Sequence, residues 1–155
     1  VPKEIFRLTH KLLSFPDDAL AAAFTRPQTS QSLLVLQAID TDGPFPSGVP
    51  AADYMQVLMI IVAGLKDSVL HDDFDAYVSA YTTSPGVART YVTYMMEESH
   101  RRLFLYLGLF LRQLEARGIA RTVLLDNLSG IFARSTKLQT PSLAAAVRRF
   151  VEFFL

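Results

Sequence analysis

The twenty residues from 99 to 118 constrain the fold of this chain more than any other stretch. Their sequence, SHRRLFLYLGLFLRQLEARG, opens on Ser99, which can cap a helix, and closes on a glycine suited to the left-handed residue after a helix end. From Leu103 to Leu111 every residue except Gly108 is large and apolar, so we expect a helix buried on nearly all sides. Such a helix needs other helices packed around it.

Apolar residues recur at helical spacing along the rest of the chain, and no stretch keeps the alternation of a β-strand. We expect the acids at 17–18 to cap a short helix, those at 72–73 to start another, and the Ser142 hydroxyl to cap the last. Proline and glycine exclude regular structure from 40 to 50, a predicted surface loop. The predicted fold class is all-α, a bundle of roughly eight helices in a single domain. Besides 99–118, the predicted helices are 2–13, 19–24, 30 or 32 to 39, 53–65, 72–81, 87–96, 121–132 and 142–155.

The charges of the chain cancel, because fifteen basic side chains balance fifteen acidic ones. We therefore expect neither nucleic acid nor an anionic membrane as a partner, and we interpret the basic pairs at 101–102 and 148–149 as solvated helix faces. The absence of cysteine excludes disulfides and thiolate metal sites and is compatible with the cytoplasm. The longest apolar run, 57–65, is too short to insert through a membrane. Because the chain begins on Val1 and ends within an apolar pattern, we expect a fragment of a longer multidomain protein.

Residues with catalytic or metal-binding chemistry form no known motif in this sequence. His10, His71 and His100 lack a partner at metal-ligand spacing, so we interpret them as surface or capping histidines. The pair at 129–130 lacks the first glycine of a nucleophile elbow, and the acids at 72–75 lack the glycine and glutamate of a calcium loop. No glycine-rich phosphate loop is present. The residues alone predict an all-helical interaction domain with no intrinsic catalytic site, metal or cofactor.

Four blocks of the sequence carry a resemblance to a known family. They are VPKEI at 1–5, AIDT at 38–41, the segment 64–69 and SHRRLFLYLGLFLRQL at 99–114. Through them nearly the whole chain resembles a RhoGAP-like domain, in particular that of the oculocerebrorenal (Lowe) type of inositol polyphosphate 5-phosphatases. The resemblance implies an all-helical bundle in a cytoplasmic membrane-traffic protein, peripheral to endosomal, Golgi or plasma membranes. Any phosphatase activity would lie outside these residues.

The resemblance also identifies the position where active RhoGAP domains carry their catalytic arginine. That arginine follows a leucine–phenylalanine pair, enters the nucleotide site of a GTPase and stabilises charge on the transferring phosphate. The matching stretch here is AFTRPQ at 23–28. With Phe24 in the place of the family phenylalanine, Thr25 occupies the finger position and Arg26 comes one residue late. Threonine cannot supply the charge, and a displacement of about 1 Å is enough to lose catalytic positioning.

Other positions that contact the GTPase in this family are also changed. Met59 and Ala63 stand where a lysine and an arginine are usual, and LKDSV at 65–69 replaces Leu-Pro-Glu-Pro-Leu. The family's Asn-Lys-Met has become RTV at 121–123, while Asn127 retains an asparagine that helps to hold the switch region. The GTPase-binding residues that the resemblance implies are Thr25, Arg26, Met59, Ala63, Arg121 and Asn127.

The Lowe-type domains are also known to capture short phenylalanine-and-histidine peptides of endocytic adaptors. They use an aromatic residue on the first helix, which Phe6 matches; the other interpretation of Phe6 is a core position. The resemblance thus predicts a catalytically inactive module that binds Rho-family GTPases of the Rac type, adaptor peptides, or both. One alternative is a GTPase activator that uses Arg26 as a displaced finger. Another is a scaffold with no GTPase contact.

Overall fold

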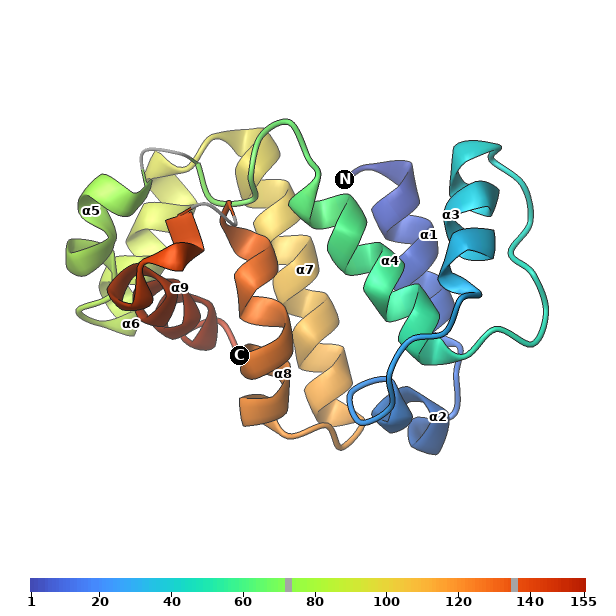
Figure 1. Cartoon of the computed structure of the whole chain (residues 1–155). Coiled ribbons are helices and arrows are strands. Elements are labelled where there is room, and N and C mark those ends of the chain that lie inside the picture. Colours follow the sequence, from blue (N-terminus) through green and yellow to red (C-terminus); the bar gives the residue numbers. More distant parts are fainter. Residues whose placement is uncertain (72–73, 135–136) are drawn as a thin grey trace. The chain divides into compact units, whose positions relative to one another are not determined.

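The computed structural model describes residues 1–71, 74–134 and 137–155, and within these ranges it is all-helical with no β-strand (Figure 1). The predicted all-α class is confirmed. The chain divides into two compact units, a first unit of residues 2–61 and a second unit of residues 62–155 together with Val1. The described α-helices are α1 Lys3–Leu13, α2 Asp17–Ala22, α3 Ser32–Asp40, α4 Ala51–Ala63, α5 Phe74–Tyr81, α6 Pro85–Thr90, α7 Glu98–Ala116, α8 Arg121–Leu128 and α9 Pro141–Glu152. Shorter helices are the π-helix η1 Tyr91–Met95 and the 3₁₀-helices η2 Ser129–Phe132 and η3 Lys137–Gln139.

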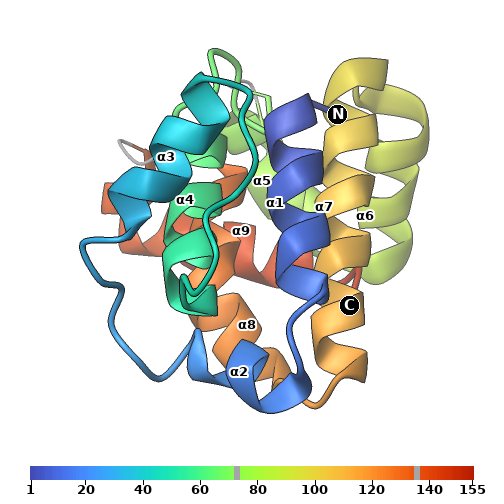
Figure 2. The ribbon, with the colours of Figure 1, turned by 90° about the vertical axis from the view of Figure 1, so that its right-hand side faces the viewer.

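The core of the first unit is built on the apolar face of α1. Ile5, Leu8 and Leu12 lie at helical spacing along this face and are fully buried. Figures 1 and 2 show α1, α3 and α4 as neighbours, so these helices enclose the core together. The other fully buried apolar side chains of this unit are Leu20 of α2, Val35 of α3, and Tyr54, Val57 and Leu58 of α4.

The core of the second unit is an aromatic cluster around α7. The Phe104 ring of α7 lies 5.5 Å, between centroids, from both Phe132 and Phe150. Phe150 of α9 in turn meets Phe74 of α5 at 4.8 Å. These edge-to-face and tilted pairs are favourable beyond their burial, and they join α5, α7, α9 and the segment that follows α8.

Helix α7 is the predicted helix at 99–118, with differences at its start and on one face. It begins at Glu98 and has no side-chain cap, so the predicted cap by Ser99 is wrong. Gly118 has a φ of +96°, the left-handed conformation expected after the helix end. Leu105 and Leu109, four residues apart on one face, are 48% and 53% exposed. The expectation that this helix is buried on nearly all sides is therefore wrong.

Two other predicted caps are also wrong. The N-cap of α2 is Pro16, so the acids at 17–18 lie inside its first turn, where they still favour the helix through its dipole. Helix α9 begins at Pro141, whose fixed φ suits the first helical position, so Ser142 lies within the helix and caps nothing. The predicted helix start at 72–73 lies outside the described residues.

Two predicted helices change type along their length. The helix predicted at 87–96 begins earlier as α6, where the Ser84 hydroxyl accepts a hydrogen bond from the Val87 amide at 3.3 Å, and continues as the π-helix η1. The helix predicted at 121–132 is α8 followed by the 3₁₀-helix η2. Apolar spacing locates a helix but does not report these local changes of hydrogen-bond pattern.

The irregular segment predicted at 40–50 covers residues 41–50, because α3 extends through Asp40. Its backbone enters the left-handed region at Asp42, with a φ of +53°, and at Gly48. Asp42 also forms ion pairs with Lys3 and with Arg7, the latter at 3.2 Å. The segment is therefore tied to α1.

Candidate functional site

The residues that the resemblance assigns to GTPase binding fall in both units of the chain. Thr25, Arg26 and Met59 belong to the first unit, and Ala63, Arg121 and Asn127 belong to the second. Each group is therefore described within its own unit or its own helix.

The turn after α2 carries Thr25 and Arg26, the residues that the resemblance assigns to the finger position and to a displaced finger. The amides of Thr25 and Arg26 both donate to the carbonyl of Ala22, at 3.2 and 2.9 Å, which wraps the backbone into a tight turn. Both side chains are exposed. The Thr25 hydroxyl bends back to the same carbonyl at 3.5 Å, whereas the Arg26 guanidinium has no hydrogen bond or ion pair within the described residues. The turn thus presents a cation that no described residue pairs with, one residue after the position that the resemblance assigns to the finger.

A buried carboxylate anchors the far end of the segment that follows this turn. Asp53, in the first turn of α4, is fully buried. It accepts hydrogen bonds from the Thr29 amide at 2.8 Å and from the Ser32 hydroxyl at 2.6 Å, and the Thr29 hydroxyl adds a third at 3.1 Å. Both carboxylate oxygens thus have hydrogen-bond partners, and Thr29 and Ser32 are tied to the start of α4. The sequence analysis did not identify Asp53, and its one signal was an acid at the start of a mostly apolar helix.

Helix α4 carries two further predicted contact positions, Met59 and Ala63, one turn apart. Residues four apart share a face of a helix, so the structure brings these two together. Met59 is partly exposed and Ala63 is exposed, and the neighbouring Ile60 is 44% exposed. This face is apolar and uncharged where the resemblance leads one to expect two cations.

Helix α8 carries Arg121 and Asn127, whose side chains both bind within the second unit. The Arg121 guanidinium donates to both carboxylate oxygens of Glu115, at 2.8 and 3.2 Å, and these hydrogen bonds raise the pKa of Arg121. The Asn127 side-chain amide donates to the carbonyl of Val123 at 2.7 Å. Six residues correspond to an offset of about 120° around a helix, so the two side chains do not share a face.

Phe6, the predicted peptide-binding aromatic, points away from the core of the first unit. Its side chain is 54% exposed on α1, and its ring stacks nearly parallel to the His10 ring with the centroids 6.0 Å apart. The alternative interpretation of Phe6 as a core residue is therefore wrong. The two rings, one turn apart, form an exposed aromatic face on the first helix.

One of the three histidines that we interpreted as surface or capping residues is not at the surface. His100 is buried, and its Nδ1 lies 2.9 Å from the carbonyl of Ser68 and 3.2 Å from that of Val69, which places the proton on Nδ1. The ring of the exposed His71 meets it edge-on at 5.3 Å. His10 is exposed, as predicted. Among the side chains that the structure describes, no group of three or more His, Cys, Asp or Glu is placed to hold a metal ion.

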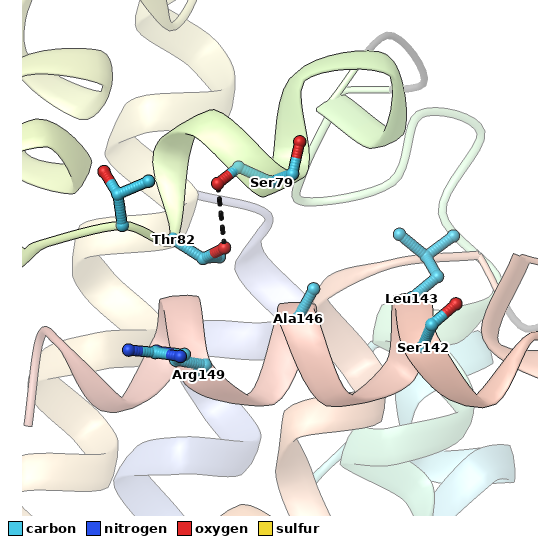
Figure 3. Close-up of a pocket in the computed structure, with 7 residues that line it drawn as sticks. Ser79, Thr82, Ser142, Leu143, Ala146 and Arg149 are labelled. Atoms are coloured by element: carbon cyan, nitrogen blue, oxygen red, sulfur yellow. Dashed lines mark hydrogen bonds between the residues drawn. The ribbon is translucent and has the colours of Figure 1, made fainter.

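A groove of about 540 Å³ lies in the second unit, between the end of α5 and helix α9 (Figure 3). Figure 3 shows Ser79 and Thr82 on the α5 side and Ser142, Ala146 and Arg149 along α9. The α9 residues recur at intervals of four and three, so they share one face of the helix. The sequence analysis missed the groove, because it interpreted the arginines at 148–149 as a solvated pair and attached no role to the hydroxyl residues.

Two further features bear on function, the hydropathy of the helices and the similarity of the chain to known proteins. Within the part of the chain that the structure describes, no helix has both the length and the hydropathy needed to cross a bilayer. No protein-family model matches the chain, and no curated protein matches it. The functional assignment therefore depends on the chemistry of the residues and on the resemblance described above.

Proposed function

We propose that this chain is a catalytically inactive, RhoGAP-like protein-interaction module that binds a Rho-family GTPase of the Rac type. The observation that carries the proposal is the turn after α2. This turn is exposed, as a segment that enters a partner must be, and it carries the uncharged Thr25, which the resemblance assigns to the position where catalysis needs a cation. The module would bind its GTPase without accelerating GTP hydrolysis.

The other assigned positions support binding without catalysis. An activator must place positive charge against the transferring phosphate and orient the attacking water. The exposed face of α4 offers Met59 and Ala63 instead of cations, and the charge of Arg121 is engaged by Glu115. These features suit a mainly apolar contact with a partner surface rather than a clamp on a phosphate.

The exposed ring of Phe6 supports a second partner, a short endocytic adaptor peptide that carries aromatic residues. Exposed aromatic side chains commonly anchor protein–peptide contacts, and Phe6 with His10 provides such an anchor on α1. In this proposal the parent protein is cytoplasmic and peripheral to endosomal, Golgi or plasma membranes.

The alternative function is a GTPase activator in which Arg26 serves as the finger. It is favoured by one observation, the exposed guanidinium of Arg26 without a partner in the described residues. Pro27 directly follows and restricts the backbone of the arginine, so the displaced charge would be held in few conformations. The same experiment separates the two functions.

The deciding experiment is single-turnover GTP hydrolysis by a Rac-type GTPase with this domain in excess, together with a direct binding measurement. We expect measurable binding and a hydrolysis rate unchanged by the domain. An acceleration of about 10³-fold or more that Arg26→Ala abolishes, while Arg89→Ala at another exposed arginine does not, would establish the activator instead. Absence of binding by both GTP-loaded and GDP-loaded forms at low salt would favour the pure scaffold.

A gain-of-function variant tests the finger position itself. Thr25→Arg places a guanidinium at the position that the resemblance assigns to the finger. If the bundle docks on the GTPase as active family members do, this variant accelerates hydrolysis while Arg89→Lys does not. Binding that is retained by Thr25→Arg without any acceleration would place the GTPase on a different surface of the domain.

A further inference from the structure

The groove between the end of α5 and helix α9 is lined by neutral hydroxyl groups and one positive charge. Four hydroxyl side chains and one guanidinium surround it, and none of its described lining residues is acidic. Its apolar lining side chains are Leu143 and Ala146. A concave site of this volume with a few placed polar groups has the features of a small-molecule site. The polar lining residues are Ser79, Thr82, Thr83, Ser142 and Arg149.

Arg149 supplies to this groove a positive charge that no described residue pairs with. Its guanidinium has no hydrogen bond or ion pair within the described residues and lies 6.0 Å from the centroid of the Phe153 ring. The adjacent Arg148 provides the contrast, because it donates to Asp126 at 2.8 Å. Two consecutive arginines of one helix thus have different surroundings, and the one that lines the groove keeps its donors available.

The hydroxyl groups provide both acceptors and a donor. Thr82 and Thr83 direct their protons to the backbone carbonyls of Ser79 and Ala80, at 3.4 and 2.9 Å, so their oxygens can accept hydrogen bonds from a ligand. The Ser142 hydroxyl has no partner within the described residues and rises from α9 toward α5 in Figure 3, so it can donate. This set matches a ligand body that carries hydroxyl groups.

We infer that this groove binds a small phosphate monoester on a hydroxyl-bearing body, such as a sugar phosphate. The planar fork of Arg149 pairs with two phosphate oxygens, as guanidinium groups do. Ser142 lies seven residues away on the same face of α9, about 10 Å along the axis, which leaves room for the body of the ligand above Ala146. No aromatic ring is among the described lining residues, so the groove offers no stacking surface for a nucleotide base. The inference does not depend on the proposed GTPase binding.

The probe for this site is glucose 6-phosphate, titrated into the ¹⁵N-labelled protein and followed by NMR. We expect saturable shifts confined to residues near 79–83 and 142–149, with a dissociation constant of roughly 0.1 to 1 mM, the range expected for a ligand of this size in an open groove. Glucose, which lacks the charge, and inorganic phosphate, which lacks the body, should each bind about tenfold more weakly or worse. Equal binding of phosphate and glucose 6-phosphate would overturn the inference.

Two variants with a matched control locate the binding. Arg149→Met should weaken glucose 6-phosphate binding about ten- to a hundredfold, while Arg148→Met, the same change at the neighbouring ion-paired arginine, should leave it within about twofold. Arg149→Lys keeps the charge but lacks the two parallel donors of the guanidinium, so its affinity for glucose 6-phosphate should lie between those of the two methionine variants. Ala146→Leu fills the groove and should abolish the shifts, with folding checked by circular dichroism. Unchanged affinity in Arg149→Met would exclude this site.

Vesicles distinguish a soluble ligand from a lipid headgroup with the same chemistry. Phosphatidic acid carries a phosphate monoester, so vesicles that contain it in phosphatidylcholine are compared with phosphatidylcholine alone. We expect neither to retain the protein. Retention that depends on Arg149, in the absence of glucose 6-phosphate shifts, would assign the groove to a lipid headgroup and overturn the soluble ligand.

Discussion

Two irregular segments of the first unit, 25–31 and 41–50, both lack regular structure but are attached in different ways. The segment 41–50 is held along its length. Arg7 of α1 donates to one of its carbonyls and lies 4.6 Å from the centroid of the Phe45 ring, and the Tyr54 hydroxyl of α4 donates to another carbonyl at 3.1 Å. Its polar backbone groups thus find partners on two helices, which makes it part of the scaffold.

The segment 25–31 is held near its two ends. Its first amides bind the carbonyl of Ala22, and Thr29 binds the buried Asp53. The side chains between these anchors, including that of Arg26, are exposed. The difference shows that the exposure of segment 25–31 follows from how it is attached. Its ends are fixed and its middle faces solvent, so it can present a short stretch of chain to a partner.

The largest effect should come from removing the anchor of the segment 25–31. Asp53→Ala leaves the Thr29 amide and two hydroxyl groups without their buried acceptor, so we expect the free energy of unfolding to fall by about 3 kcal/mol. Urea denaturation measures this loss. Amide exchange at Thr29 should accelerate in the same variant.

A matched carboxylate tests whether the buried hydrogen bonds cause that loss. Asp40→Ala removes an exposed acid at the end of α3, and we expect a change within about 0.5 kcal/mol. Asp53→Asn keeps one acceptor oxygen, so its loss in free energy of unfolding should lie between those of Asp40→Ala and Asp53→Ala. Equal effects of Asp40→Ala and Asp53→Ala would show that the anchor contributes nothing beyond a general effect of charge.

The second effect concerns the attachment of 41–50 to α1. Arg7→Met removes the ion pair to Asp42, the hydrogen bond to the Gly43 carbonyl and the cation–π contact with Phe45. Together these are worth about 2 kcal/mol at a partly buried site, and thermal or urea unfolding should show that loss. Arg7→Lys keeps the charge but loses the fork, so it should recover only part of the stability.

The third effect is smaller and depends on pH. Tyr54→Phe removes the hydrogen bond from the Tyr54 hydroxyl to the Pro46 carbonyl and should cost about 1 kcal/mol at neutral pH. Burial raises the pKa of Tyr54 above its usual 10.0, so the neutral phenol stabilises the fold below pH 10 and that contribution is lost as the pH rises through the folded pKa. The stability difference between wild type and Tyr54→Phe should shrink above pH 10, whereas a constant difference would contradict the assignment.

The spacing of apolar residues was sufficient to predict where the helices lie, but it did not predict how they begin and end. The burial of Ile5, Leu8 and Leu12 follows from their spacing alone, which is why the all-helical class could be predicted. Capping depends on which neighbouring residue first adopts helical geometry. At α9 the first helical residue is Pro141, so Ser142 lies inside the helix. The spacing of apolar residues does not distinguish between these two starts.

The site could be predicted less well, because its main features join residues distant in the sequence. Asp53 accepts hydrogen bonds from Thr29 and Ser32, more than twenty residues earlier, and Arg149 lines the same groove as the hydroxyls that follow α5. The local pattern of one sequence does not show which residues distant along the chain come together. The burial of His100 was missed for the same reason, since its acceptors at 68–69 lie on another segment.

The smallest effect should be at Arg26, the counterpart of Arg7 in the other segment. Arg26→Met makes the same chemical change as Arg7→Met, but its guanidinium has no partner within the described residues. We expect the free energy of unfolding to change by less than about 0.5 kcal/mol, measured by urea denaturation beside Arg7→Met. A loss as large as that of Arg7→Met would mean that Arg26 holds the fold rather than faces a partner. Because the variant should keep the fold intact, any loss of GTPase binding in Arg26→Met reports on the contact with the partner itself.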